Sequence, residues 1–157
     1  MTGGAGPTVG AGAGGGAGGG GRAWRLVVAW GPVVLWAALI FTLSAQPGLS
    51  ISQDASVDGP LRHIAHGFVY TVLLVLIVRG MGRLGQPLTL RTAVIAAAAT
   101  ILYGVSDEIH QLFVPDRTGQ AIDVGYDTIG AAIGLTIVWA WGRVMARRTD
   151  GGTGTTD

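Results

Sequence analysis

The chain has 157 residues, a length expected for one domain; 49% of them are apolar and only 12% are charged. Its mean hydropathy of +0.50, reached although 28 residues are glycine, is typical of an integral membrane protein rather than a soluble domain. The absence of cysteine excludes disulfides, thiolate catalysis and cysteine-ligated metals.

Four apolar segments lie between two low-complexity ends. Residues 1–21 and 149–157 contain almost nothing to bury, so we expect a flexible Gly/Ala-rich tail at the start and a second tail at the end. The apolar segments cover about residues 26–45, 64–81, 89–105 and 124–144, each near the roughly 17–25 residues that cross a bilayer as a helix. The first exceeds the apolar core of a signal peptide, about 7–15 residues, so we expect it to be retained. The sequence therefore predicts an all-α membrane bundle of four transmembrane helices within residues 22–148.

The arginines are distributed unevenly about these segments. Eight of the ten basic residues fall on one side of a four-helix topology, namely Arg22, Arg25, Arg79, Arg83, Arg91, Arg143, Arg147 and Arg148. The opposite side has only Arg62 and Arg117, together with most of the carboxylates and all three histidines. The positive-inside rule then predicts that both termini are cytoplasmic and that the two polar connections face outward.

Polar residues recur at helical spacing at the outward ends of three segments. The stripes are Arg62, His66 and Tyr70 in the second segment, Thr100, Tyr103, Asp107 and Gln111 in the third, and Asp123 and Asp127 in the fourth. Charges that face lipid are costly, so we expect the stripes to turn inward and form a pocket that is open outward. Its candidate residues are Arg62, His66, Tyr70, Asp107, Glu108, His110, Gln111, Arg117, Asp123 and Asp127.

The fourth segment also carries a helix-packing pattern. Gly130 and Gly134 form a G-x-x-x-G motif, and the third segment has the small-residue run from Ala96 to Thr100. Small surfaces let helix backbones approach closely in a membrane. We therefore expect Gly130 and Gly134 to pack the fourth segment against the third.

These motifs together resemble the VanZ-like family over about residues 30–142. In that family the first span ends in Ser-x-Gln-Pro and the second opens with Arg-Lys-x-x-His-x-x-x-Tyr. The third carries Asp-Glu-x-x-Gln-x-Phe followed by Pro-x-Arg, and the fourth begins Asp-x-x-x-Asn/Asp-x-x-Gly-x-x-x-Gly. The matching residues are Ser44, Gln46, Pro47, Arg62, His66, Tyr70, Asp107, Glu108, Gln111, Phe113, Pro115, Arg117, Asp123, Asp127, Gly130 and Gly134. His63, Gly67 and Asp116 depart from the pattern, standing where Lys, an aromatic residue and Gly are common.

The resemblance implies a four-helix protein of the bacterial cytoplasmic membrane. For the family's namesake it also implies low-level teicoplanin resistance, and hence a role in the cell envelope. The resemblance does not supply a biochemical mechanism.

The residues themselves leave three functions open. The charged groups form an ion-paired network that only sets helix register, or the arginines bind an anionic lipid-linked envelope intermediate or a peptidoglycan-related ligand. In the third, His66 or His110 is the general base of a hydrolase or transferase acting on a lipid-linked substrate, oriented by Asp107 or Glu108. His63 is expected at the surface, and Ser44 is expected to cap or turn the end of its helix.

We expect neither a metal nor another cofactor, because no recognised ligand spacing is present. If a metal does bind, Asp107, Glu108, His110 and Asp123 are the candidate ligands for Mg²⁺ or Zn²⁺. The arginine-rich side is explained by membrane topology, so nucleic acid is not expected as a partner. The lipid bilayer is the one partner that composition requires, whereas a four-helix monomer with an apolar inner half does not suit a transporter.

Overall fold

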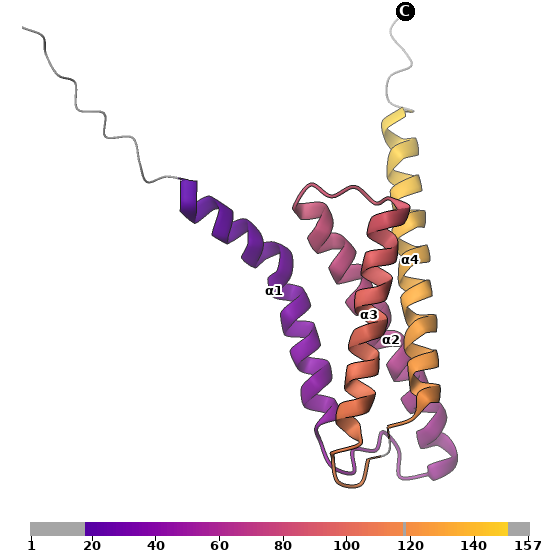
Figure 1. Ribbon diagram of the computed structural model, residues 1–157. Coiled ribbons are helices and arrows are strands. Elements are labelled where there is room, and N and C mark those ends of the chain that lie inside the picture. Colours follow the sequence, from indigo (N-terminus) through magenta and orange to yellow (C-terminus); the bar gives the residue numbers. More distant parts are fainter. Residues whose placement is uncertain (1–17, 118, 151–157) are drawn as a thin grey trace, which may run out of the picture.

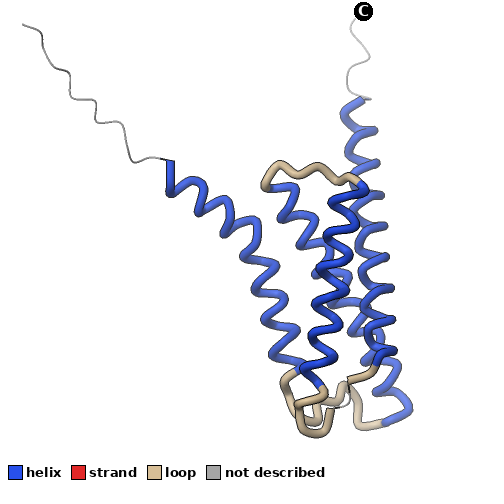
Figure 2. Tube along the Cα trace, viewed as in Figure 1, coloured by secondary structure: helices blue, strands red, loops and turns tan. Residues whose placement is uncertain are grey.

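The chain folds into four helices, as seen in a computed structural model that describes residues 18–117 and 119–150. They are α1 (Gly18–Ser44), α2 (Ala55–Arg83), α3 (Leu90–Gln111) and α4 (Ala121–Asp150), and the described residues contain no strand (Figures 1 and 2). All four are long and apolar enough to cross a membrane. The predicted all-α membrane bundle of four helices is therefore confirmed.

The helices extend beyond the apolar segments that predicted them. α2 begins at Ala55 instead of 64, and α3 ends at Gln111 instead of 105. The α2 start is capped by Asp54, whose side chain accepts a hydrogen bond from the Ser56 backbone N–H. That hydrogen bonding, first from the Ser56 side chain and then from its backbone, lowers the pKa of Asp54. Hydropathy marks only the lipid-facing length of a helix, so it misses polar turns that continue the same helix.

Two of the helices reach into the residues that were expected to be tails. α1 starts at Gly18, inside the expected tail of residues 1–21, and α4 runs to Asp150, two residues into the expected tail of residues 149–157. The remaining tail residues, 1–17 and 151–157, lie outside the described part of the chain.

α2 makes the most extensive contacts of the four helices, packing chiefly on α4 and also on α1 and α3. The buried apolar core includes Ile40 of α1, Tyr70, Leu73 and Ile77 of α2, and Ala96 of α3. The start of α1 leans away from the bundle, and Pro32 lies inside this helix (Figure 1). Proline lacks the N–H of a regular helical hydrogen bond, which accounts for a bend there.

The G-x-x-x-G motif packs against α2, so the predicted packing of this motif on the third segment is wrong. A methyl group at Gly130 would overlap the backbone carbonyl of Gly67, and one at Gly134 would lie 3.0 Å from the carbonyl oxygen of Thr71. The Thr71 hydroxyl donates to the carbonyl oxygens of Gly67 and Gly130, at 2.7 and 2.8 Å. Glycine at both 67 and 130 lets α2 and α4 touch backbone to backbone.

Two aromatic side chains tie α1 to its neighbours through backbone acceptors. The Trp36 indole N–H donates to the Val69 carbonyl of α2 at 2.9 Å. The Tyr103 hydroxyl of α3 donates to the Ala37 carbonyl of α1 at 2.6 Å. These bonds matter because α1 has the least extensive contacts of the four helices, packing mainly on α2 and only slightly on α3.

Replacing Tyr103 with phenylalanine is expected to lower the free energy of unfolding by about 0.5–1.5 kcal/mol, the net value of one such hydrogen bond. The measurement is chemical unfolding of the purified protein in detergent. Tyr126→Phe is the matched control, because the Tyr126 ring stacks on His63 and the substitution preserves that ring. Equal losses from both variants would contradict the role assigned to the Tyr103 hydroxyl.

Candidate functional site

Buried polar side chains gather at one end of the bundle. At this end, called here the polar end, α1 and α3 finish while α2 and α4 begin (Figure 1). Every buried carboxylate among the described residues lies there. The buried polar side chains of the polar end are Ser44, Asp107, Glu108, Gln111, Asp123 and Asp127.

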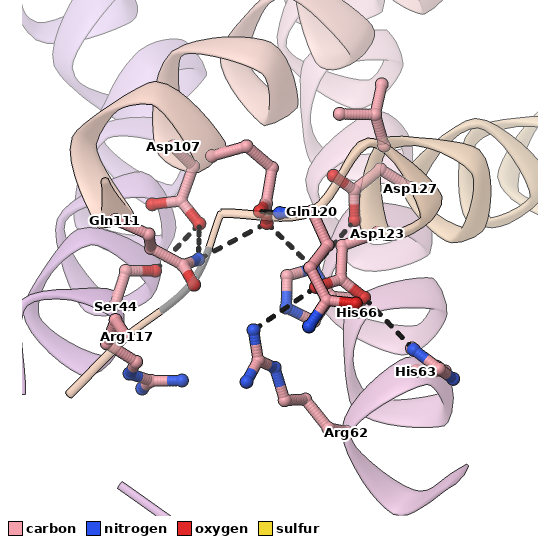
Figure 3. Close-up of polar contacts among 12 residues, drawn as sticks. Ser44, Arg62, His63, His66, Asp107, Gln111, Arg117, Gln120, Asp123 and Asp127 are labelled. Carbon is pink, nitrogen blue, oxygen red and sulfur yellow. Dashed lines mark hydrogen bonds and ion pairs between the residues drawn. The ribbon is translucent and has the colours of Figure 1, made fainter. Parts of the chain in front are cut away.

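The first part of the site joins α1 to the last turn of α3. The Ser44 hydroxyl donates to Asp107 Oδ2 at 2.7 Å, and Gln111 Nε2 donates to the same oxygen at 3.1 Å. Gln111 also donates to Glu108 Oε1 at 3.3 Å, and the Gln120 backbone N–H donates to Glu108 Oε2 at 2.8 Å. Ser44 thus hydrogen-bonds across the bundle at the end of α1, where the sequence predicted only a cap or turn (Figure 3).

The second part joins α2 to the start of α4. Arg62 pairs with Asp123 at 3.2 Å, and His63 Nε2 lies 3.4 Å from the other oxygen of Asp123. His66 Nδ1 lies 3.0 Å from Asp127 Oδ1 (Figure 3). Arg62 and His66 are one turn apart on α2, as are Asp123 and Asp127 on α4, and residues four apart share a helix face.

The sequence predicted that His63 lies at the surface, but the side chain is only partly exposed and contacts its neighbours. Its side chain is 28% exposed, its Nε2 faces Asp123, and its ring stacks on Tyr126 with centroids 4.4 Å apart. A histidine next to a polar stripe can still reach that stripe's partners, which a helical projection does not show.

Arg117 comes from the connection between α3 and α4 and caps α1. Its Nε donates to the Gln46 carbonyl at 3.2 Å and its guanidinium NH2 to the Leu43 carbonyl at 3.1 Å. Partial burial, and after it the like charge of Arg62, lower the pKa of Arg117. The connection turns at Asp116, whose φ of 58° lies in the left-handed region that favours glycine. This conformation accounts for Gly being common at that position in the family pattern.

A cavity of about 280 Å³ opens between α1, α2 and α3 at the polar end. Most of the surface of its wall is apolar, and the remainder is contributed by polar and charged side chains. The lining residues are Ile40, Leu43, Ser44, Leu49, Ile51, Asp58, Arg62, Ala65, His66, Val69, Tyr70, Asp107, Gln111 and Arg117.

The ten residues expected in one pocket divide into three groups. Arg62, His66, Tyr70, Asp107, Gln111 and Arg117 line the cavity. Glu108, Asp123 and Asp127 are buried and contact cavity-lining residues without being part of the lining. His110 lies elsewhere: its ring stacks on Phe41 with centroids 4.4 Å apart. The expectation of a single open pocket is corrected to a cavity with a buried acidic layer beside it.

Eight lining residues were not among the sequence candidates, and three of these, Leu49, Ile51 and Asp58, belong to the α1–α2 connection or hold it in place. Asp58 Oδ1 accepts hydrogen bonds from the backbone N–H groups of Ile51 and Ser52, at 2.6 and 2.9 Å. This holds the α1–α2 connection at the cavity, where Leu49 and Ile51 contribute apolar surface. Asp58 is four residues before Arg62, so extending the polar stripe of α2 by one turn would have found it.

Several buried polar atoms of lining residues have no hydrogen-bond partner among the described residues. The Tyr70 hydroxyl, Asp107 Oδ1 and Gln111 Oε1 are buried and make no hydrogen bond within the described part of the chain. Buried polar atoms are nearly always hydrogen-bonded, so these three are available to water or to a ligand. They include one donor and two acceptors.

Comparison with known proteins agrees with the motifs. The family model for VanZ/LLP1 matches residues 29–142, which is most of the chain and nearly the range of the resemblance found by motif. Searches of curated proteins and of solved structures found no match. The chain is a multi-pass membrane protein and belongs to the VanZ-like family.

Proposed function

We propose that this protein binds an anionic lipid-linked intermediate of the bacterial cell envelope in the cavity at its polar end. The observation that carries the proposal is that two arginines lie beside apolar side chains in the wall of one cavity. Arg62 and Arg117 line a cavity that also exposes Leu49, Ile51 and Val69. A guanidinium suits a phosphate or carboxylate, and aliphatic side chains suit the first carbons of a lipid chain.

Both arginines are held in position before any ligand arrives. Asp123 anchors Arg62, and the carbonyls of Leu43 and Gln46 anchor Arg117. Donors fixed in place lose little conformational entropy on binding, which increases affinity. The unpartnered Tyr70 hydroxyl adds a hydrogen-bond donor to the same cavity.

The polar end is proposed to face the outside of the cytoplasmic membrane. The eight other arginines lie in the opposite halves of their helices: Arg22 and Arg25 in α1, Arg79 and Arg83 in α2, Arg91 in α3, and Arg143, Arg147 and Arg148 in α4. The positive-inside rule supports a cytoplasmic location for that end and for both termini. A cavity at the outer surface gives access to envelope intermediates exposed there.

Ala65→Leu is expected to reduce lipid binding, because Ala65 lines the cavity and leucine would fill part of it. Native mass spectrometry of detergent-purified protein should show a retained polyprenyl phosphate with the wild type. The variant should bind polyprenyl phosphate at least about tenfold more weakly, a loss of about 1.4 kcal/mol in binding free energy. The corresponding polyprenyl alcohol, which lacks the anion, should not be retained.

Ala132→Leu is the matched control, since Ala132 is exposed on α4 and does not line the cavity. It should bind polyprenyl phosphate as the wild type does. Equal retention of the alcohol and the phosphate would overturn anion recognition. Equal retention by Ala65→Leu and Ala132→Leu would show that the lipid binds elsewhere.

The family resemblance extends the proposal to glycopeptide tolerance in cells. Expression of the wild type should raise teicoplanin tolerance, while Ala65→Leu at equal abundance should not. Loss of tolerance at normal abundance would exclude a purely structural role for the polar end. If neither the wild type nor the variant changes the teicoplanin tolerance of the cells, drug resistance is removed from the proposal. Lipid binding is then judged by mass spectrometry alone.

Hydrolysis or transfer on the same lipid is the second candidate. It is favoured by His66, which lines the cavity with Asp127 hydrogen-bonded to its Nδ1. A buried carboxylate in that position orients an imidazole for general-base chemistry. Phosphate release from a polyprenyl diphosphate by the purified wild type would establish it, and binding without release would reject it.

A further inference from the structure

We propose that His66, Glu108 and Asp127 bind one divalent transition-metal ion beside the cavity. The three side chains come from α2, α3 and α4, and one ligand atom from each lies within 4.8 Å of the others. His66 Nδ1 is 3.0 Å from Asp127 Oδ1 and 3.8 Å from Glu108 Oε1. Ligands at zinc's usual bond lengths in a tetrahedron are roughly 3.3–3.6 Å apart, and these two distances bracket that range.

The charges of the polar end provide an independent reason for a cation. Among the described residues, Asp123 is the one buried carboxylate of the polar end in an ion pair with a guanidinium, and Asp107 is hydrogen-bonded by Ser44 and Gln111. Within the part of the chain that the structure describes, the only ion pairs of Glu108 and Asp127 are with the imidazole of His66. One imidazole can supply at most one positive charge to two carboxylates, so two ionised carboxylates here leave an excess of negative charge that a divalent ion would offset.

The carboxylates are also arranged as metal ligands are. Asp127 is fully buried, its Oδ1 points into the group, and its Oδ2 has no hydrogen-bond partner among the described residues. Glu108 is oriented by two donors, the Gln120 backbone N–H on Oε2 and the Gln111 amide on Oε1. Such supporting hydrogen bonds are typical around metal-binding carboxylates.

The ligand set selects the kind of metal. One imidazole with two carboxylates suits zinc or a similar transition metal better than magnesium or calcium, which prefer oxygen ligands throughout. Three protein ligands leave a coordination position open, as in catalytic rather than structural zinc sites. Because His66 also lines the cavity, the metal site would adjoin the space proposed for the lipid head group. Metal binding itself does not depend on the lipid proposal.

Metal content decides the proposal. Protein purified without a histidine tag, incubated with Zn²⁺ and passed through a desalting column should carry about one zinc ion per chain, as a single three-ligand site requires. His66→Gln should reduce zinc to the level of the buffer. His110→Gln is the matched control and should retain zinc, since His110 stacks on Phe41 away from the group.

A ligand exchange covers the case in which His66→Gln does not fold. His66→Cys preserves a metal ligand, so Co²⁺ bound to this variant should show a sulfur-to-metal absorption band that the wild type lacks. Zinc at buffer level in folded wild type, or equal zinc in folded His66→Gln and wild type, would overturn the site. So would a His66→Cys spectrum without the new band. In those cases a protonated His66 bridging the two carboxylates would explain the cluster.

Discussion

Gly130→Ala is expected to destabilise the bundle more than any other glycine-to-alanine substitution in α4. The added methyl would overlap the Gly67 carbonyl, which is backbone and cannot rotate away. Overpacking of this kind costs about 1–3 kcal/mol. Separating the helices would also weaken the Thr71 hydrogen bond to the Gly130 carbonyl. The measurement is the free energy of unfolding in detergent, followed by tryptophan fluorescence.

Gly125→Ala supplies the control in the same helix. A methyl group at Gly125 meets nothing within 4 Å, so this variant should be neutral or slightly stabilising, as alanine favours helices. If Gly130→Ala is as stable as Gly125→Ala, then α2 and α4 do not pack backbone to backbone at Gly67 and Gly130.

Arg62→Ala is expected to cost about 3–5 kcal/mol, the penalty for leaving one member of a buried ion pair without its partner. The Asp123 side chain is 1% exposed and would retain only His63 at 3.4 Å. Asp123→Asn should cost less, about 1–3 kcal/mol, because the Arg62 side chain is 20% exposed and reaches the cavity. The order of the two losses is the diagnostic result.

Chemical unfolding of both variants beside Arg91→Ala measures that order. Arg91 is exposed near the start of α3, so its removal should change stability little. A loss from Arg62→Ala no greater than that from Asp123→Asn would mean that Asp123 is not stabilised by the guanidinium.

Helical spacing was sufficient to find much of the site within single helices. Arg62, His66 and Tyr70 were predicted to share a face, and all three line the cavity. Asp123 and Asp127 were also predicted to share a face, but they lie in the buried layer beside it. A polar stripe indicates that a face turns inward, because lipid disfavours charge. It does not indicate which part of the interior that face meets.

The partner of the G-x-x-x-G motif shows the same limit. Small residues at 130 and 134 predicted a close helix contact, and Ala96 to Thr100 made α3 the expected partner. The surface complementary to Gly130 is the backbone at Gly67, with Thr71 beside it. Glycine at 67, where the family pattern has an aromatic residue, was the one available sign that α2 admits this approach.

The sequence by itself determined the membrane location, the four helices and the family, because these follow from hydropathy, helix length and ordered motifs within segments. It also identified the polar residues, since a charge in an apolar chain stands out wherever it is. Only the tertiary structure decided that Arg117 caps α1, that Asp58 holds the α1–α2 connection at the cavity, and that His66 meets both Glu108 and Asp127. Those contacts join segments far apart in the chain, and their distances depend on how the helices pack against one another.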